Sequence, residues 1–148
     1  MVEIGFYHLT RSPVAVALPA LLARTRALGE KALVACPDEA TLKHLDAALW
    51  TCPTPDWLPH GTAATPHPEW QPVYLTTGPE NPAKAAFLFR ISGAGEDVAA
   101  YARVFDLFDG TDEAQLQGAR ARWRAAKAAG HALTYWKQEE TGWVKAGL

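Results

Sequence analysis

The feature that most constrains the fold is a strand-length apolar run followed directly by a segment of helical periodicity. Residues 31–36 read Lys-Ala-Leu-Val-Ala-Cys, which is typical of a buried strand. After Pro37, residues 38–50 carry large apolar side chains at the i, i+3, i+7 and i+8 spacing of one helix face: Leu42, Leu45, Leu49 and Trp50. Asp38 and Glu39 in the first turn suit the positive end of the helix dipole. The pattern therefore predicts a buried strand followed by an amphipathic helix.

The segment before this one predicts the same kind of unit. Residues 3–9 form an expected strand rich in Ile, Phe and Tyr. A helix should follow, with Ser12 as its N-cap, Pro13 at its first position and Gly29 at its C-terminal end. Pro19 lies inside this helix and is expected to kink or split it. Residues 3–36 thus form a β-α-β unit, which normally gives parallel strands with a right-handed crossover.

The remainder of the chain continues the alternation. Further strands are expected at residues 73–77, 86–91, 104–108 and 132–137, the last of them paired with residues 143–145. Residues 62–72 contain three prolines and are expected to be irregular, whereas another helix should start at Glu96. The expected fold is α/β and three-layered, with a mostly parallel central sheet flanked by helices in a Rossmann-like topology. We expect a single domain over residues 1–148, with a short C-terminal extension at residues 138–148.

Composition excludes several classes of protein. The chain has 148 residues, of which 49% are hydrophobic and 20% charged, as in ordinary globular domains. Its net charge of −2 does not favour strong direct binding of nucleic acid. We expect no secretory signal and no membrane span, because no apolar run is long enough. The two cysteines, Cys36 and Cys52, are expected to be reduced thiols in a cytoplasmic protein.

Sequence signals for catalysis and for cofactor binding are weak. Gly93 and Gly95 stand between a strand and a helix, where a phosphate-binding loop would lie. However, Val98 occupies the third glycine position, and Asp106 comes too early for a ribose-binding acid. A tight turn is the favoured interpretation, and a small α/β nucleotide-binding enzyme is the alternative. Four candidate zinc ligands match no compact spacing: Cys36, Cys52, His60 and His67. We expect no catalytic site, no metal and no cofactor.

An aromatic and proline-rich segment follows the helix at residues 38–50. It places Trp57, Leu58, Pro59 and His60 where polar turn residues normally stand. These side chains either fold back to cover the sheet or present an apolar patch to another protein. The residues alone favour the first interpretation.

The long helix expected over residues 112–129, capped by Thr111 and ended by Gly130, carries a second candidate site. Arg120, Arg124 and Lys127 form a row at i, i+4 and i+7. Trp123 lies at the border between this row and the apolar stripe. Basic residues late in a helix also complement its dipole, which is the structural alternative. A border of this kind suits a ligand that has a carboxylate beside an aromatic ring. A direct single-stranded-DNA site using Trp123, Trp136 and the arginines is another alternative.

Three motifs in order along the chain resemble the chi subunit of bacterial DNA polymerase III. They are Phe-Tyr-His-Leu at residues 6–9, Leu-Asp-Ala-Ala-Leu-Trp at 45–50 with the aromatic-Leu-Pro-His segment at 57–60, and the Arg- and Trp-containing helix at 119–130. The resemblance covers nearly the whole chain and is weakest over residues 62–85.

The resemblance implies a non-catalytic accessory protein of the clamp-loader assembly. Members of this family link the psi subunit to the C-terminal tail of single-stranded-DNA-binding protein. It implies a psi-type interface at Trp50, Trp57, Leu58, Pro59 and His60, with Trp57 where relatives often have phenylalanine. The tail would bind at Arg120, Trp123 and Arg124, with Trp123 where relatives often have tyrosine. We add Lys127 to this tail site because it shares their face.

Overall fold

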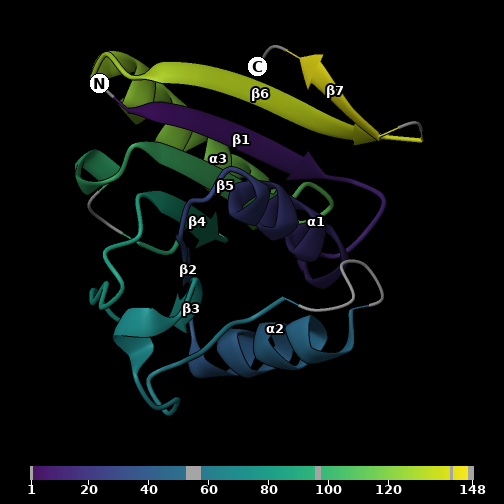
Figure 1. Cartoon of the computed structure of the whole chain (residues 1–148). Helices are drawn as coiled ribbons and strands as arrows, with labels where there is room; N and C mark the ends of the chain where they lie inside the picture. The colour runs from purple at the N-terminus through teal and green to yellow at the C-terminus, as the bar shows by residue number, and fades with distance from the viewer. Residues whose placement is uncertain (1, 53–57, 96–97, 141, 147–148) are drawn as a thin grey trace.

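The computed structural model describes residues 2–52, 58–95, 98–140 and 142–146. Within these residues, seven strands form one sheet in the order β3-β2-β4-β5-β1-β6-β7 (Figure 1). The strands are β1 (Glu3–Leu9), β2 (Ala32–Ala35), β3 (Val73–Thr76), β4 (Phe87–Ile91), β5 (Arg103–Asp109), β6 (Ala132–Glu139) and β7 (Gly142–Ala146). Every neighbouring pair is parallel except β6 and β7, which are antiparallel. The predicted mostly parallel α/β sheet is confirmed.

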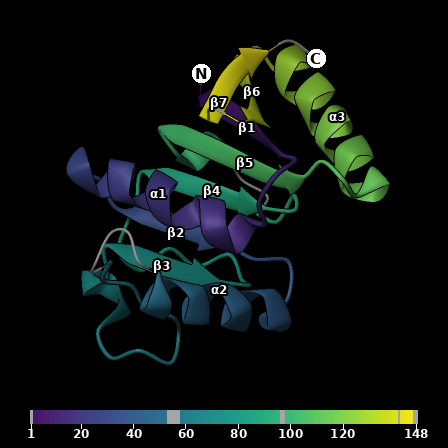
Figure 2. The ribbon, with the colours of Figure 1, turned by 90° about the vertical axis from the view of Figure 1, so that its right-hand side faces the viewer.

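Helices cover both faces of the sheet. In the described part of the chain they are α1 (Val14–Ala27), α2 (Glu39–Thr51) and α3 (Glu113–Ala128), with short 3-10 turns at Pro68–Trp70 and Val98–Ala100. Figure 2 shows α1 and α2 on one side of the sheet and α3 on the other. Each side buries its own apolar cluster, one under α1 and α2 and one under α3. The predicted three layers are thus confirmed.

Two predicted helix caps are wrong by one residue. Pro13, not Ser12, is the N-cap of α1, and it makes no side-chain cap hydrogen bond. The Ser12 hydroxyl instead accepts a hydrogen bond from Gln138 Nε2 at 2.7 Å. At α3, Asp112 replaces the predicted Thr111, and its carboxylate accepts from two backbone N–H groups of the first turn. Ser12 is taken up by a contact with a residue far along the chain, which a local pattern cannot show, whereas at α3 the carboxylate of Asp112 is the acceptor that reaches the first-turn N–H groups.

The predicted helix ends are confirmed, whereas the predicted split at Pro19 is not. Gly29 and Gly130 have φ of 78° and 84°, the left-handed conformation expected just past a helix end. Pro19 does not split α1, which runs unbroken through it, with Pro19 itself buried. The helix predicted to start at Glu96 is represented among the described residues only by the 3-10 turn at Val98–Ala100, and Glu96 lies outside them.

Trp50 does not share the buried face of α2, contrary to the prediction. Leu42, Leu45 and Leu49 are at most 8% exposed, whereas Trp50 is 68% exposed. At roughly 100° per residue, Trp50 lies about 140° around the helix from Leu45, so it turns away from the core. The i+8 spacing therefore placed a surface residue on the expected core face.

The C-terminal residues add to the sheet. Strand β6 continues to Glu139, and β7 pairs with it as predicted, in an antiparallel orientation. The ring of Trp143 meets Tyr7 edge-on at a centroid distance of 5.1 Å, which fastens β7 to the core beneath α1. In the part of the chain that the structure describes, no helix has both the length and the apolar character needed to cross a membrane.

Candidate functional site

Helix α3 is positioned by one capped end and one narrow apolar face. The Asp112 carboxylate accepts from the N–H groups of Ala114 (3.0 Å) and Gln115 (3.4 Å). Ala119 is buried against the sheet, and Trp123 packs beside it four residues later. This spacing leaves most of the helix facing solvent.

The four basic residues between positions 120 and 127 divide into two groups. Arg122 points toward β5 and grips the fully buried Asp106, with Nε–Oδ2 at 2.7 Å and Nη2–Oδ1 at 2.9 Å. Arg120, Arg124 and Lys127 are exposed, and among the described residues they form no ion pair. The predicted basic row is therefore a set of free cations, whereas Arg122 belongs to the interior.

Trp123 is held between two rings of the sheet. Its ring lies edge-on to Phe6 at 5.2 Å and to Tyr135 at 5.9 Å, with interplanar angles of 66° and 88°. The buried Tyr135 hydroxyl contacts Nδ1 of His8. Part of the Trp123 ring therefore packs against the sheet. The ring is only half-buried, and its exposed part lies on α3 next to the basic row.

The charge of Arg120 acts on two titratable groups of the neighbouring strands, Tyr135 on β6 and His8 on β1. Burial raises the pKa of Tyr135, and the positive charge of Arg120 acts against this rise. Burial also lowers the pKa of His8, and Lys137 and Arg120 lower it further. Sequence analysis did not single out His8 or Tyr135 for this site, because only the sheet register brings them beside α3. The structure gathers two aromatic rings and several cations, an arrangement suited to a carboxylate next to an apolar group.

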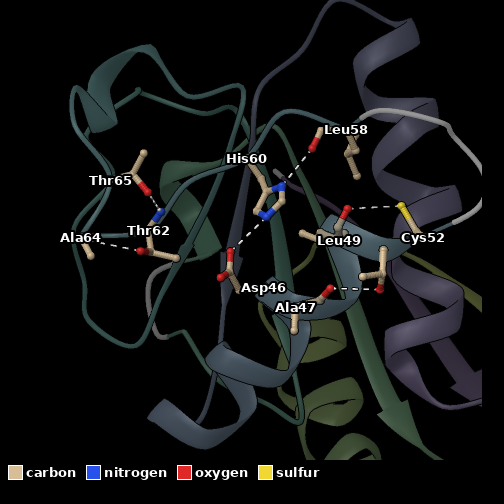
Figure 3. Close-up of polar contacts among 10 residues, drawn as sticks. Asp46, Ala47, Leu49, Cys52, Leu58, His60, Thr62, Ala64 and Thr65 are labelled. Atoms are coloured by element: carbon tan, nitrogen blue, oxygen red, sulfur yellow. Dashed lines mark hydrogen bonds and ion pairs between the residues drawn. The ribbon is translucent and has the colours of Figure 1, made fainter.

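The second candidate site lies where residues 58–61 cross α2 (Figure 3). His60 is buried, its Nδ1 lies 2.9 Å from the carbonyl oxygen of Leu58, and its Nε2 lies 3.0 Å from Asp46 Oδ1 without hydrogen-bond geometry. Gly61 exchanges two backbone hydrogen bonds of 2.9 Å with the edge strand β3. The segment is therefore fixed at both ends, and the Asp46–His60 contact is one that sequence analysis missed.

The five predicted interface residues differ in how far they are buried, and one of them lies outside the described residues. Leu58 and His60 are buried, so these two fold back onto the protein, as the residues alone suggested. Pro59 is half-buried, and the exposed ring of Trp50 lies 4.8 Å from the ring of His60. Trp57 lies outside the described residues. The surface that could meet a partner is centred on Trp50, supported from beneath by His60.

The loop after β4 has the geometry of a tight turn. Gly93 and Gly95 have φ of 83° and 90°, and Ala94 N–H donates to the carbonyl of Ile91 at 3.1 Å. A Cβ at Gly93 would lie 2.5 Å from Nη1 of Arg122, so the backbone packs against the guanidinium. Glycine is required here for its conformation and for this close approach.

A cavity of about 400 Å³ lies at the carboxyl ends of β1, β4 and β5, where nucleotides bind in many doubly wound folds. Three consecutive backbone N–H groups at its edge, those of Thr10, Arg11 and Ser12, converge on Oε1 of Gln138 at 2.9–3.2 Å. Gln138 thus already accepts from these three N–H groups, which are therefore not open to a phosphate at this end of the sheet. This contact counts against the nucleotide-binding alternative.

Two further sequence-based possibilities are not assembled by the fold. Trp123 packs into the core under α3, but Trp136 packs into the core under α1 and α2, on the opposite face of the sheet. They cannot form one stacking surface for single-stranded DNA. Among the described residues, no group of three His, Cys, Asp or Glu side chains is arranged to hold a metal ion.

Comparison with known proteins agrees with the motifs. The family model described as "DNA polymerase III chi subunit, HolC" matches residues 1–134. A probable DNA polymerase III subunit chi from Rickettsia prowazekii (strain Madrid E) is 28% identical over 92 residues, which are 62% of this chain and 56% of the relative. The match thus spans little more than half of that relative's length. The predicted resemblance is confirmed: the chain belongs to the chi subunit family, an accessory component of DNA polymerase III.

Proposed function

We propose that this chi-family protein is a non-catalytic adaptor in the cytoplasm. One surface, on α3, binds the acidic C-terminal tail of single-stranded-DNA-binding protein. The other, around Trp50, binds psi or an equivalent clamp-loader component. The observation that carries the proposal is the row of three exposed cations beside the half-buried Trp123, none of which forms an ion pair with a described residue.

The chemistry of α3 suits the end of an acidic peptide. An arginine can bind a terminal carboxylate through two parallel hydrogen bonds, as Arg122 already does with Asp106 inside the protein. Arg120 and Arg124 are free to do the same at the surface. Trp123, fixed by its ring contacts, needs no reordering to cover an apolar terminal side chain, which lowers the entropy cost of binding.

The two proposed surfaces are compatible with simultaneous binding. Trp50 lies on α2 and the basic row lies on α3, and these helices cover opposite faces of the sheet (Figure 2). A large exposed aromatic ring that packs on a fixed support is the type of residue that dominates interface energy. An adaptor with these two faces can connect two partners without either blocking the other.

The tail interaction is tested by calorimetry with a synthetic acidic peptide that ends in phenylalanine. We expect the peptide without its last residue to bind more weakly, and the Arg120→Ala, Arg124→Ala variant to lose most of the affinity. Added salt should also weaken binding, because the cations are exposed. The control variant, Arg24→Ala with Lys43→Ala, removes two exposed charges from the opposite face and should bind normally. Equal binding of the two peptides would refute the proposal.

The second surface is tested by capture of a purified clamp-loader assembly. Trp50→Ala should weaken capture by about 2 kcal/mol, the usual cost of removing an aromatic anchor. Trp70→Ala is a matched control, because Trp70 is 69% exposed and Trp50 is 68% exposed. Both variants should keep a near-normal melting temperature. Equal capture by the two variants would show that Trp50 is not the anchor.

A further inference from the structure

The β6–β7 hairpin presents one of its faces beside α3. Side chains alternate along β6, so Leu133, Tyr135 and Lys137 share a face. Leu133 and Tyr135 pack into the core under α3, which identifies that face. Trp136, between Tyr135 and Lys137, packs on the other side of the sheet. Lys137 therefore lies on the α3 side, and it is exposed.

Strand β7 places an apolar side chain next to this cation. Val144 is directly opposite Lys137 in the antiparallel register, and directly opposed residues project to the same face. Val144 is 45% exposed, one of five large apolar side chains that are exposed among the described residues. Its neighbour Trp143 points the other way, onto Tyr7, so the hairpin is anchored through one face and open on the other.

The open face of the hairpin is continuous with the basic row of α3. Tyr135 touches Trp123 on one side, and two positions further along β6 lies Lys137. Lys137 is the register partner of His8 on β1, and the charge of Arg120 acts on both His8 and Tyr135, so both cations lie near the His8–Tyr135 contact. One carboxylate, that of Glu139, shares this face of β6, at the end next to the turn.

We propose that the β6–β7 hairpin is the second wall of the peptide site. It rests on the proposed function of α3, and the occupant is the same acidic peptide with an apolar C-terminal residue. Lys137 binds a further carboxylate of the peptide, and Val144 contacts an apolar side chain. Charge complementarity supports this occupant, because the peptide is acidic and Lys137 lies on the same side of the sheet as the exposed cations of α3. Most of the hairpin lies beyond residue 134, where the match to the family model ends.

The test compares two lysines on opposite faces of one hairpin. Lys137→Gln and Lys145→Gln change the net charge equally, but Lys145 lies opposite Trp136 and so faces away from α3. Lys137→Gln should weaken binding of the synthetic peptide about two- to five-fold, the range expected for an exposed ion pair, and Lys145→Gln should not. Equal affinities of the two variants would overturn the proposal.

A second pair of variants tests the apolar contact. Val144→Asp should weaken binding about five-fold or more, because it removes apolar area and adds repulsion of the acidic peptide. Val16→Asp is the control, since Val16 is 64% exposed on α1, on the other side of the sheet. Amide NMR shifts on adding peptide to the unaltered protein should move at residues 135–137 and 142–146. Absence of these shifts would overturn the proposal independently of any variant.

The same experiments separate this proposal from the one on which it rests. If the Arg120→Ala, Arg124→Ala variant loses binding while Lys137→Gln and Val144→Asp bind normally, the hairpin wall is wrong and the α3 site stands. If the double variant of α3 also binds normally, both proposals fail.

Discussion

Replacement of Arg122 by methionine should destabilise the protein much more than replacement of Arg124 by methionine. Methionine preserves most of the apolar stem of the side chain but removes both hydrogen bonds to Asp106. The Asp106 carboxylate is 0% exposed and would remain buried without its main partner. By contrast, Arg124 is exposed and makes no ion pair with any described residue.

The magnitude follows from the environment of Asp106. Removing one partner of a buried ion pair typically costs about 3–5 kcal/mol, because a buried charge is left uncompensated. Arg90 is a second cation near Asp106 and reduces this cost. Burial lowers the pKa of Arg90, the charge of Asp106 raises it and the charge of Arg122 lowers it, so Arg90 interacts with both groups. Its charge continues to attract Asp106 after the substitution, which favours the lower end, about 3 kcal/mol. For a chain of this size, that corresponds to a loss of about 6–12 °C in melting temperature.

Urea unfolding and calorimetry measure this loss directly. Arg124→Met, with the same change in charge and helix propensity, should stay within about 0.5 kcal/mol of the unaltered protein. At a temperature where it remains folded, Arg122→Met should still bind the acidic peptide. A loss below about 1 kcal/mol for Arg122→Met would refute the assignment of Arg122 to the interior, because it would match a typical surface pair.

Two further predictions follow from titratable groups. Burial raises the pKa of the Cys36 thiol to about 12. A thiol reagent at pH 8 should therefore label Cys52 in the folded protein and Cys36 only after unfolding. Equal labelling rates of the two cysteines in the folded protein would contradict this. The pKa of His8, which contacts Tyr135, is lowered below its usual 6.5 by burial and by the charges of Lys137 and Arg120. A backbone hydrogen bond with Gly110 and the charge of Asp109 act in the opposite direction. His8 is therefore neutral at pH 7.5 and gains a positive charge only as the pH falls through a pKa below 6.5, so peptide affinity should increase on that acidic side by about two- to five-fold. His8→Gln should abolish the increase; an unchanged pH profile in that variant would exclude His8 as its source.

The sequence by itself determined the order and type of most elements. Short apolar runs and helical periodicities are local patterns, and each strand predicted from them is present. Gly29 and Gly130 marked helix ends correctly, because a left-handed residue past a helix is a local requirement. The family was also readable from local motifs at residues 6–9, 45–50 and 119–130. The candidate residues of α3 could be chosen from spacing, because exposed residues three and four apart lie on one face of a helix.

Only the tertiary structure decided which of those residues are free to bind. Spacing could not show that Arg122 meets Asp106, since that contact depends on how α3 lies across β5. Nor could it show that Trp50 faces solvent while His60 turns inward, because both orientations depend on how residues 58–61 cross α2. The hairpin wall has the same origin: Lys137 and Val144 are seven residues apart, and the antiparallel register alone sets them side by side. Such contacts arise from the packing of whole elements, which no local pattern encodes.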